Sequence, residues 1–302
     1  MSAAEVIPSG ETGCDRLLGF TIPQRHARGR VVRLGPVLDS ILSAHDYPPP
    51  IRHLLAEALV LASLIGSLLK DADSQLTIQA QTQGGIVELL ACDYRAGALR
   101  GYVRHDAERL AMVGANPSLY ALFGQAYLAI TFDDAMSGQR YQGIVPLEGD
   151  SLSQACERYF AQSEQVPTLL RTAVQWDGHR CLAAGLLAQH LAEGEEGRER
   201  LHVRLDHPEW EHVAVLAGSL RHEELVDRSL SLEALVWRLF HDEAEIRVEP
   251  LASLERGCRC TAEHYRSVLA RFPENDRAEM RGEDGLIAVD CAFCARVFKI
   301  DA

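Results

Sequence analysis

Residues 51–70 read IRHLLAEALVLASLIGSLLK and follow the loop that Pro48-Pro49-Pro50 ends. This run is apolar on most of its helical faces, so we expect a helix that is buried on nearly all sides at the centre of the fold. Arg52, His53 and Glu57 interrupt it, and the charge-free part, residues 58–69, is shorter than the ~20 residues that a membrane span requires. The run therefore predicts the central helix of a soluble protein.

The residues around this helix alternate as strands do. Residues 76–81, LTIQAQ, have a period of two, Gly84-Gly85 follows, and residues 86–94 form the expected hairpin partner. A helix is expected at residues 151–165, with Asp150 or Ser151 as its N-cap. Sequential hairpins favour antiparallel sheet covered by helices, so we predict an α+β core domain over residues 1–188. Further strands are expected at residues 99–105, 127–134, 141–149, 168–176 and 180–190.

The composition limits the classes of function. The chain has 302 residues, 47% of them hydrophobic, and a net charge of −13, which argues against a general binder of nucleic acid or of anionic membranes. The residues contain no phosphate-binding loop, no His-Glu-x-x-His motif and no Gly-x-Ser-x-Gly elbow. The start of the chain lacks the pattern of a secretory signal. We expect a non-enzymatic protein of the reducing cytosol, where clustered cysteines indicate metal or redox chemistry.

The composition changes at residue 189. Residues 189–255 contain 16 Asp and Glu against seven Arg, which accounts for −9 of the net charge, and six of the twelve histidines. Helices are expected at residues 208–220, around 222–229 and at 231–241, where Ser231 is a good N-cap. Two interpretations stay open: a solvated, acidic helical subdomain, or a metastable linker that buries little apolar area against its ordering entropy.

The strongest signal lies in residues 256–302. Two close pairs of cysteines, Cys258-Arg259-Cys260 and Cys291-Ala292-Phe293-Cys294, are separated by thirty residues that include a helical stretch at 262–270 and a strand at 286–290. Two such pairs can surround one Zn²⁺ tetrahedrally. We therefore predict a small zinc-binding domain, with one Zn²⁺ per chain, whose folding depends on the metal.

The residues alone leave the role of this site open between structure and switch. Most four-cysteine sites are purely structural. Metal-bound thiolates can also be oxidised, and a disulfide cannot serve as a thiolate ligand, so oxidation would eject zinc and remove the folding energy of the domain. His264 lies close to the first pair, but with four cysteines present we expect it on the surface. The isolated cysteines are expected to be buried free thiols: Cys14, Cys92, Cys156 and Cys181.

At these cysteines the chain resembles the heat shock protein 33 family of redox-regulated holdase chaperones. The resemblance extends over nearly the whole chain in the same order. Besides the Cys-x-Cys and Cys-x-x-Cys pairs, it rests on His45-Asp46-Tyr47-Pro48, Leu76-Thr77-Ile78-Gln79 with Gly84-Gly85, residues 141–149 (YQGIVPLEG), residues 159–168 (YFAQSEQVPT) and residues 237–241 (WRLFH).

The resemblance implies a function and a mechanism. In the reduced family members the four cysteines hold zinc, and the folded linker and C-terminal domain cover the client-binding surface. Oxidation to Cys258–Cys260 and Cys291–Cys294 disulfides would release zinc, unfold the linker at residues 189–255, and activate a homodimer that holds unfolding proteins without ATP. The runner-up is a structural zinc ribbon that binds nucleic acid on an unrelated core, but residues 256–302 carry eight basic and eight acidic side chains and offer no basic face.

Two positions depart from the family pattern. Ala295 stands where the family usually has Gly after the last cysteine, and a Gly there would allow a left-handed turn. Glu255-Arg256-Gly257 stands where an aromatic or aliphatic residue is more usual. Neither departure removes a cysteine, so we expect zinc binding to persist with slightly altered local geometry and oxidation behaviour.

Overall fold

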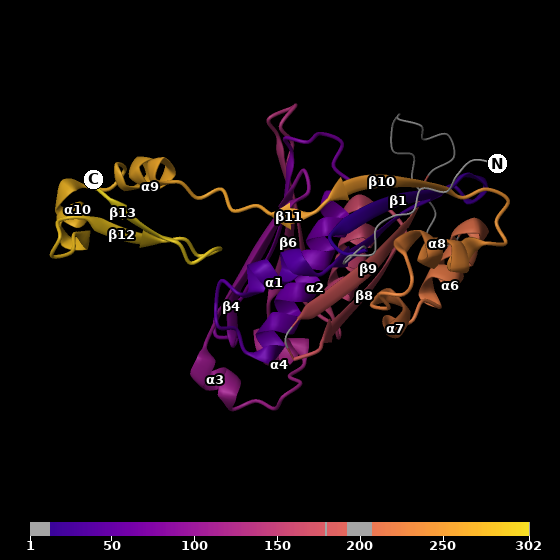
Figure 1. The fold of residues 1–302 in the computed structure, drawn as a ribbon, viewed down its shortest axis with the longest axis horizontal. Helices are drawn as coiled ribbons and strands as arrows, with labels where there is room; N and C mark the ends of the chain where they lie inside the picture. Colours follow the sequence, from indigo (N-terminus) through magenta and orange to yellow (C-terminus); the bar gives the residue numbers. More distant parts are fainter. Residues whose placement is uncertain (1–12, 179, 192–206, 302) are drawn as a thin grey trace.

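The computed structural model describes residues 13–178, 180–191 and 207–301. Helix α2 (Pro49–Gly66) lies between two sheets and contacts strands of both (Figure 1). It is long and apolar enough to cross a membrane by length and composition, but 78% of it is buried inside the protein. The prediction of a central core helix is confirmed.

The first sheet has five antiparallel strands in the order β10 (Arg247–Ser253), β1 (Arg16–Ile22), β2 (Ala27–Leu34), β9 (Cys181–His190), β8 (Thr168–Trp176). All ten residues of β9 are buried, because α2 covers one face of this sheet and further helices cover the other. A strand that is buried on both faces does not alternate in polarity. The sequence pattern did not identify β1 and β2; buried residues run nearly without interruption through β1 and through Val31–Leu34 of β2.

The second sheet has six strands in the order β11 (Glu255–Arg256), β5 (Ala98–His105), β4 (Val87–Arg95), β3 (Gln75–Gln81), β6 (Tyr127–Asp133), β7 (Arg140–Pro146). In β3 the apolar residues Leu76, Ile78 and Ala80 are buried in the cluster around α2, as the alternation predicts. The pairing of β3 with β4 confirms the expected hairpin. Only β11 runs parallel to its neighbour, β5.

Short helices complete the core. Helix α5 (Leu152–Tyr159) begins at Ser151, whose hydroxyl accepts a hydrogen bond from the Gln154 backbone, so Ser151 is the N-cap. The helix is shorter than expected, because a π-turn, η2 (Phe160–Glu164), replaces its last residues. The other short elements are η1 (Pro23–Arg25), α1 (Pro36–Leu42), α3 (Ala107–Ala111) and α4 (Leu119–Phe123).

The acidic region forms three helices on the outer face of the first sheet: α6 (Pro208–Gly218), α7 (His222–Leu225) and α8 (Leu232–Phe240). They bury a second hydrophobic cluster, separate from that around α2, in which Phe240 meets Phe20 of β1 with ring centroids 5.6 Å apart. Ser231 caps α8 as predicted. The prediction of an α+β fold with a helical region after the core is confirmed.

The C-terminal unit consists of α9 (Ala262–Leu269), α10 (Glu274–Met280), β12 (Ile287–Asp290) and β13 (Val297–Ile300). Only three of its residues form a buried apolar cluster: Leu269, Ile287 and Ile300. Along the longest axis of the molecule this unit lies at the opposite end from α6–α8 (Figure 1). Along the chain the two are connected by β10 and β11.

A buried arginine joins the core to the helices of the acidic region. Arg33 of β2 is 1% exposed, and its Nε and Nη2 atoms donate to the Leu225 carbonyl at 3.1 and 3.0 Å. Its Nη1 atom donates to the Leu230 carbonyl at 2.7 Å. Burial lowers the pKa of Arg33. One cationic side chain thus satisfies two carbonyls at the end of α7 and in the loop before α8.

We predict that Arg33→Met weakens the packing of α7 and α8 by about 2–3 kcal/mol, because both carbonyls lose a charged donor. Amide hydrogen exchange should show lower protection in α8 with unchanged protection in α2. Arg28→Met on the same strand is the matched control, since Arg28 bonds Gln189 inside the sheet. Equal loss in both variants, or in α2 and α8 alike, would contradict this role of Arg33.

Candidate metal centre

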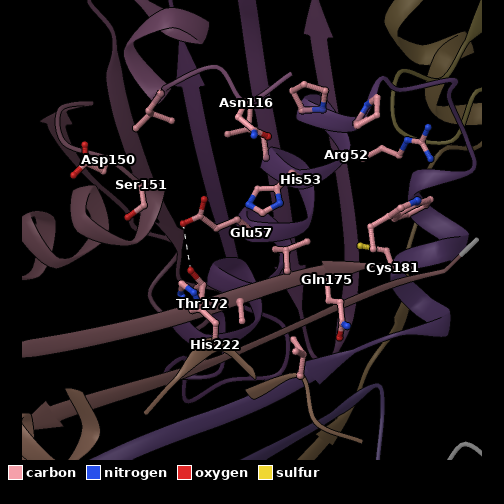
Figure 2. Close-up of a pocket in the computed structure, with 18 of the residues that line it drawn as sticks. Arg52, His53, Glu57, Asn116, Asp150, Ser151, Thr172, Gln175, Cys181 and His222 are labelled. Carbon is pink, nitrogen blue, oxygen red and sulfur yellow. Dashed lines mark hydrogen bonds between the residues drawn. The ribbon is translucent and has the colours of Figure 1, made fainter. Parts of the chain in front are cut away.

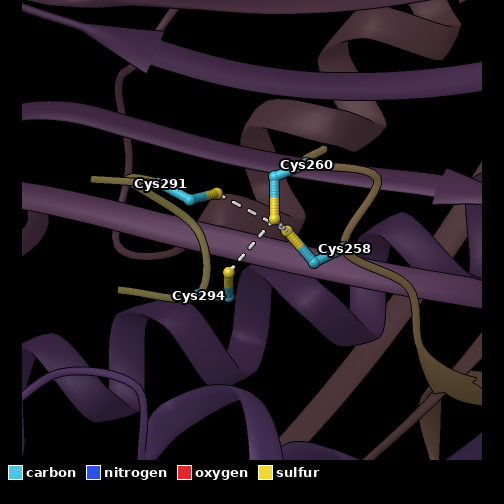
Figure 3. A group of neighbouring side chains, drawn as sticks. All are labelled: Cys258, Cys260, Cys291 and Cys294. Carbon is cyan, nitrogen blue, oxygen red and sulfur yellow. Dashed lines mark hydrogen bonds between the residues drawn. The ribbon is translucent and has the colours of Figure 1, made fainter. Parts of the chain in front are cut away.

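The four predicted cysteines converge on one point (Figure 3). Their sulfur atoms all lie within 4.8 Å of one another. The Sγ–Sγ distances are 3.3 Å for Cys258–Cys260, 3.5 Å for Cys258–Cys291 and 3.4 Å for Cys260–Cys294. A tetrahedral zinc site with Zn–S bonds of about 2.3 Å has sulfur atoms about 3.8 Å apart, so the arrangement suits a metal held by four sulfurs.

The hairpin β12–β13 shapes one half of the group. Cys291 follows β12, and its carbonyl accepts hydrogen bonds from the backbone N–H groups of Cys294 at 3.2 Å and Ala295 at 2.8 Å. This closes a tight turn that places both sulfurs on one side. Cys258 and Cys260 come from the segment between β11 and α9, where Thr261 caps α9. The two halves meet only through the tertiary fold.

The surroundings of Cys291 favour its thiolate. Although burial acts against the charged form, the Tyr265 hydroxyl and the backbone N–H groups of Cys294 and Phe293 donate to the sulfur and lower the pKa of Cys291 to about 6. Burial, followed by the effect of the neighbouring thiols, raises the pKa of Cys260. One thiolate is therefore available near neutral pH, and a cation at the centre would favour the other three.

The structure also tests the predictions for His264 and for the four isolated cysteines. His264 is exposed on α9 and is not a member of the four-sulfur group, as expected. Cys92, Cys156 and Cys181 are buried free thiols, as expected, but Cys14 is only half-buried, so the expectation of burial was wrong for it. Cys14 lies just before β1 near the rim of the first sheet, where Gly35 is its neighbour.

Ala295 adopts the left-handed conformation, with φ of 55°. The expectation of altered geometry at this position is therefore not met: the turn that suits glycine is present with an alanine in it. At Gly257, glycine is needed because two strands approach closely. A Cβ on Gly257 would approach the Ala98 Cβ to 2.4 Å, so glycine lets β11 run against β5 just before Cys258.

The cysteine loops contact the core directly. The ring of Phe293, between Cys291 and Cys294, lies under the Arg100 guanidinium at 4.2 Å and meets Tyr102 edge-on at 6.4 Å. The His45 Nε2 atom is 2.8 Å from the Ala292 carbonyl oxygen. The sequence did not predict these contacts. Its one signal was that Ala292 and Phe293 lie between Cys291 and Cys294.

The CxC pair has a contact of its own. The guanidinium of Arg259, between Cys258 and Cys260, lies 3.5 Å from the carboxylate of Asp93 on β4, which also pairs with Arg100. Gly257 donates its backbone N–H to the Leu99 carbonyl at 2.7 Å. Both cysteine pairs are thus tied to the sheet by the residues beside or between them.

A cavity of about 1120 Å³ lies elsewhere, between α2, β8 and α7 (Figure 2). The Glu57 carboxylate on its wall accepts hydrogen bonds from Ser153 and Thr172, so its role there is structural. Burial, followed by Asp39, raises the pKa of Cys181 to about 12, so this thiol is not an activated nucleophile. Because His222 of α7 forms part of the wall, the cavity has this shape only while α7 is packed on the core.

We predict that Ala295→Gly stabilises the C-terminal unit by about 0.5–1 kcal/mol, because glycine removes the cost of a Cβ at positive φ. Metal loss from the reduced protein to a chromogenic chelator should slow by about 2- to 5-fold. Ala292→Gly is the matched control in the same turn, because its φ is not positive, and it should accelerate the loss. Equal effects of both substitutions would show that the left-handed turn carries no strain.

Comparison with known proteins agrees with this fold. A family model described as "Hsp33 protein" matches residues 15–301. The chain is 39% identical over 295 residues to the 33 kDa chaperonin of Caulobacter vibrioides, with 95% of each chain covered. It is 34% identical to the 33 kDa chaperonin of Photorhabdus laumondii, with 95% of this chain and 93% of that protein covered.

The fold has a solved counterpart. The crystal structure of the 33 kDa chaperonin (heat shock protein 33 homolog) from Thermotoga maritima superposes with a TM-score of 0.75 over 95% of this chain and 94% of that chain, at 18% identity. At this identity the likeness shows the fold, while the family model and the sequence relatives show the family. The chain belongs to the Hsp33 family of chaperones.

Proposed function

We propose that this chain is a redox-regulated, ATP-independent holdase whose switch is a zinc centre formed by Cys258, Cys260, Cys291 and Cys294. The observation that carries the proposal is the four-sulfur group inside a unit whose apolar cluster contains, within residues 257–301, only three buried residues: Leu269, Ile287 and Ile300. So small a core cannot offset the ordering entropy of its chain. The fold of the unit must therefore depend on what the sulfurs bind.

The donor set favours zinc as the bound metal. Four sulfur donors in a tetrahedral arrangement suit Zn²⁺, while Ca²⁺ and Mg²⁺ take oxygen ligands. Bound zinc would cross-link the CxC and CxxC segments and supply on the order of 10 kcal/mol to folding. Tyr265 and the turn amides would hold the Cys291 thiolate in place for it.

Oxidation would then act on the chain itself. As zinc ligands the cysteines would be thiolates, so each pair would give up two electrons as one S–S bond forms, and one hydrogen peroxide molecule would take up these electrons with two protons from solvent and become two water molecules. The proposed products are the Cys258–Cys260 and Cys291–Cys294 disulfides, whose sulfurs no longer serve as thiolate ligands. Both disulfides also change the loops that carry Arg259 and Phe293.

These loops provide the route to the rest of the molecule. Phe293 contacts β5, Ala292 contacts His45, and Arg259 contacts Asp93. If disulfides changed the conformation of these loops, the contacts with the core would be lost. The chain between this unit and α8 consists of β11, a two-residue strand, and β10, which pairs with β1. We propose that their release weakens α6–α8 and uncovers the apolar outer face of the first sheet.

The remaining features of the proposal follow the family resemblance. The core is assigned to residues 1–188, the linker to 189–255 and the zinc domain to 256–302. The activated form is a homodimer in the cytosol that binds unfolded or partly unfolded proteins and performs no catalysis. A nucleic-acid module on an unrelated core is not supported, since the family match spans residues 15–301.

We predict that hydrogen peroxide at a mildly destabilising temperature releases one zinc ion per chain while suppression of aggregation of an unfolding test protein appears. A thiol reductant with added zinc should reverse both effects. Cys156→Ala is the control, because burial keeps this isolated thiol protonated and the variant should respond as the parent does. Zinc that stays bound, or that leaves without any gain in holding activity, would contradict the proposal.

We also predict that Phe293→Ala weakens docking of the C-terminal unit while its zinc content stays at one per chain. The lost ring contacts with Arg100 and Tyr102 correspond to about 1–2 kcal/mol, so the undocked fraction should rise by about 5- to 30-fold. Proteolysis of residues 247–260 measures this fraction. Phe272→Ala is the control, since Phe272 belongs to the same unit and is 42% exposed. Equal cleavage in both variants would show that Phe293 does not hold the unit.

A further inference from the structure

Two histidines meet where the core passes into the acidic helices. His190 is the last residue of β9, and His207 immediately precedes α6; their ring centroids are 4.9 Å apart. The His190 ring is also 6.3 Å from the ring of Trp210 in α6. His190 is only 3% exposed, because α6 covers it. Its solvent exposure therefore depends on whether α6 is packed on the core.

The surroundings of His190 favour its neutral form. Its ring is hydrogen-bonded to the backbone of Arg25, while its Nδ1 atom is buried and has no hydrogen-bond partner. A proton on Nδ1 would create a charged donor that lacks an acceptor, which is costly in a buried site. Burial, followed by the nearby His207 and His26, lowers the pKa of His190.

His207 contributes a hydrogen-bond acceptor to α6. It is the N-cap of α6, and its Nδ1 atom accepts the hydrogen bond of the Glu209 backbone N–H at 3.3 Å. A proton on Nδ1 would remove the lone pair that accepts this bond. It would also place a positive charge at the N-terminus of a helix, where the helix dipole favours negative charge.

The charged groups around His190 and His207 have opposing effects on the attachment of α6 at low pH. Arg25 is paired with Glu209 of α6 and with Glu243 after α8, and these carboxylates offset part of the positive potential. The His212 Nε2 atom is 2.6 Å from a Glu243 oxygen, so protonation of His212 would strengthen the attachment of α6. Among the described residues, His26 also lowers the pKa of His190, while Glu209 raises it.

We propose that His190 and His207 form a proton-sensitive latch between the core and the acidic helices. The latch holds α6 when both rings are neutral and releases it when they are protonated. Where release of α6–α8 activates holding of clients, as proposed above, mild acid lowers the threshold for activation independently of the cysteines.

The sign of the pH dependence follows from the packed and released states. His190 has a lowered pKa when α6 is packed and an ordinary pKa of about 6.5 when α6 is released. The released state therefore binds more protons. The latch is fully effective above about pH 7 and weakens as the pH falls through about 6.5.

The test uses the reduced full chain without oxidant, between pH 7.5 and pH 5.5. Hydrogen exchange of α6 amides, corrected for the intrinsic effect of pH, measures the released fraction. We expect this fraction to rise about tenfold in the parent. It should stay nearly constant in the double variant His190→Gln, His207→Asn, since Gln keeps a donor and Asn is a good N-cap. The same rise in the double variant as in the parent would overturn the proposal.

Three further measurements keep the result unambiguous. If the double variant is already released at pH 7.5, the single variant His190→Gln decides, because it removes the group whose pKa differs between the packed and released states, and a rise as large as the parent's would overturn the proposal. His212→Gln, which removes the opposing pair with Glu243, should steepen the pH dependence, and a shallower one would count against the latch. Metal content and peroxide-driven holding activity at pH 7.5, measured on the same samples, show separately whether the redox proposal holds.

Discussion

The small apolar core of the C-terminal unit is the constraint on which the behaviour of the molecule depends. Three buried residues cannot hold two helices and a hairpin together, whereas a metal bound by four sulfurs can. The cysteine loops that would bind the metal also carry the contacts to the core, through Phe293 and Arg259. The state of the sulfurs and the docking of the unit are therefore linked by geometry.

The acidic helices are held by a different kind of interaction. They bury an apolar cluster against the outer face of the first sheet, and polar contacts add to it: Arg33 donates to the Leu225 and Leu230 carbonyls, and Arg25 pairs with Glu209 and Glu243. The Arg25 pairs are partly exposed and contribute little net stability. A region of this kind can leave the core without disturbing the separate cluster around α2.

The two attachments lie at opposite ends of the molecule (Figure 1). The strand β10 pairs with β1 on the first sheet, and β11 follows it onto the second sheet beside β5. This path gives oxidation at the cysteines a physical connection to α6–α8. At the other end of the molecule, His190 and His207 lie between the core and α6. The proposed latch would let pH act on α6 there, separately from oxidation of the cysteines.

Local patterns in the sequence determined the central helix, the alternating strands such as β3, the caps Ser151 and Ser231, and the candidate metal residues, because each depends on nearest-neighbour periodicity or on residue chemistry. The hairpin β1–β2 was not predicted, because its strands have neither the strict alternation of β3 nor the long apolar run of β9. The tertiary structure alone decided that Ala295 keeps a left-handed turn, that Phe293 and Arg259 bind the core, and that His190 meets His207. The contacts of Phe293, Arg259 and His190 join residues far apart in the chain and no local pattern encodes them, whereas the Ala295 turn closes locally on the Cys291 carbonyl.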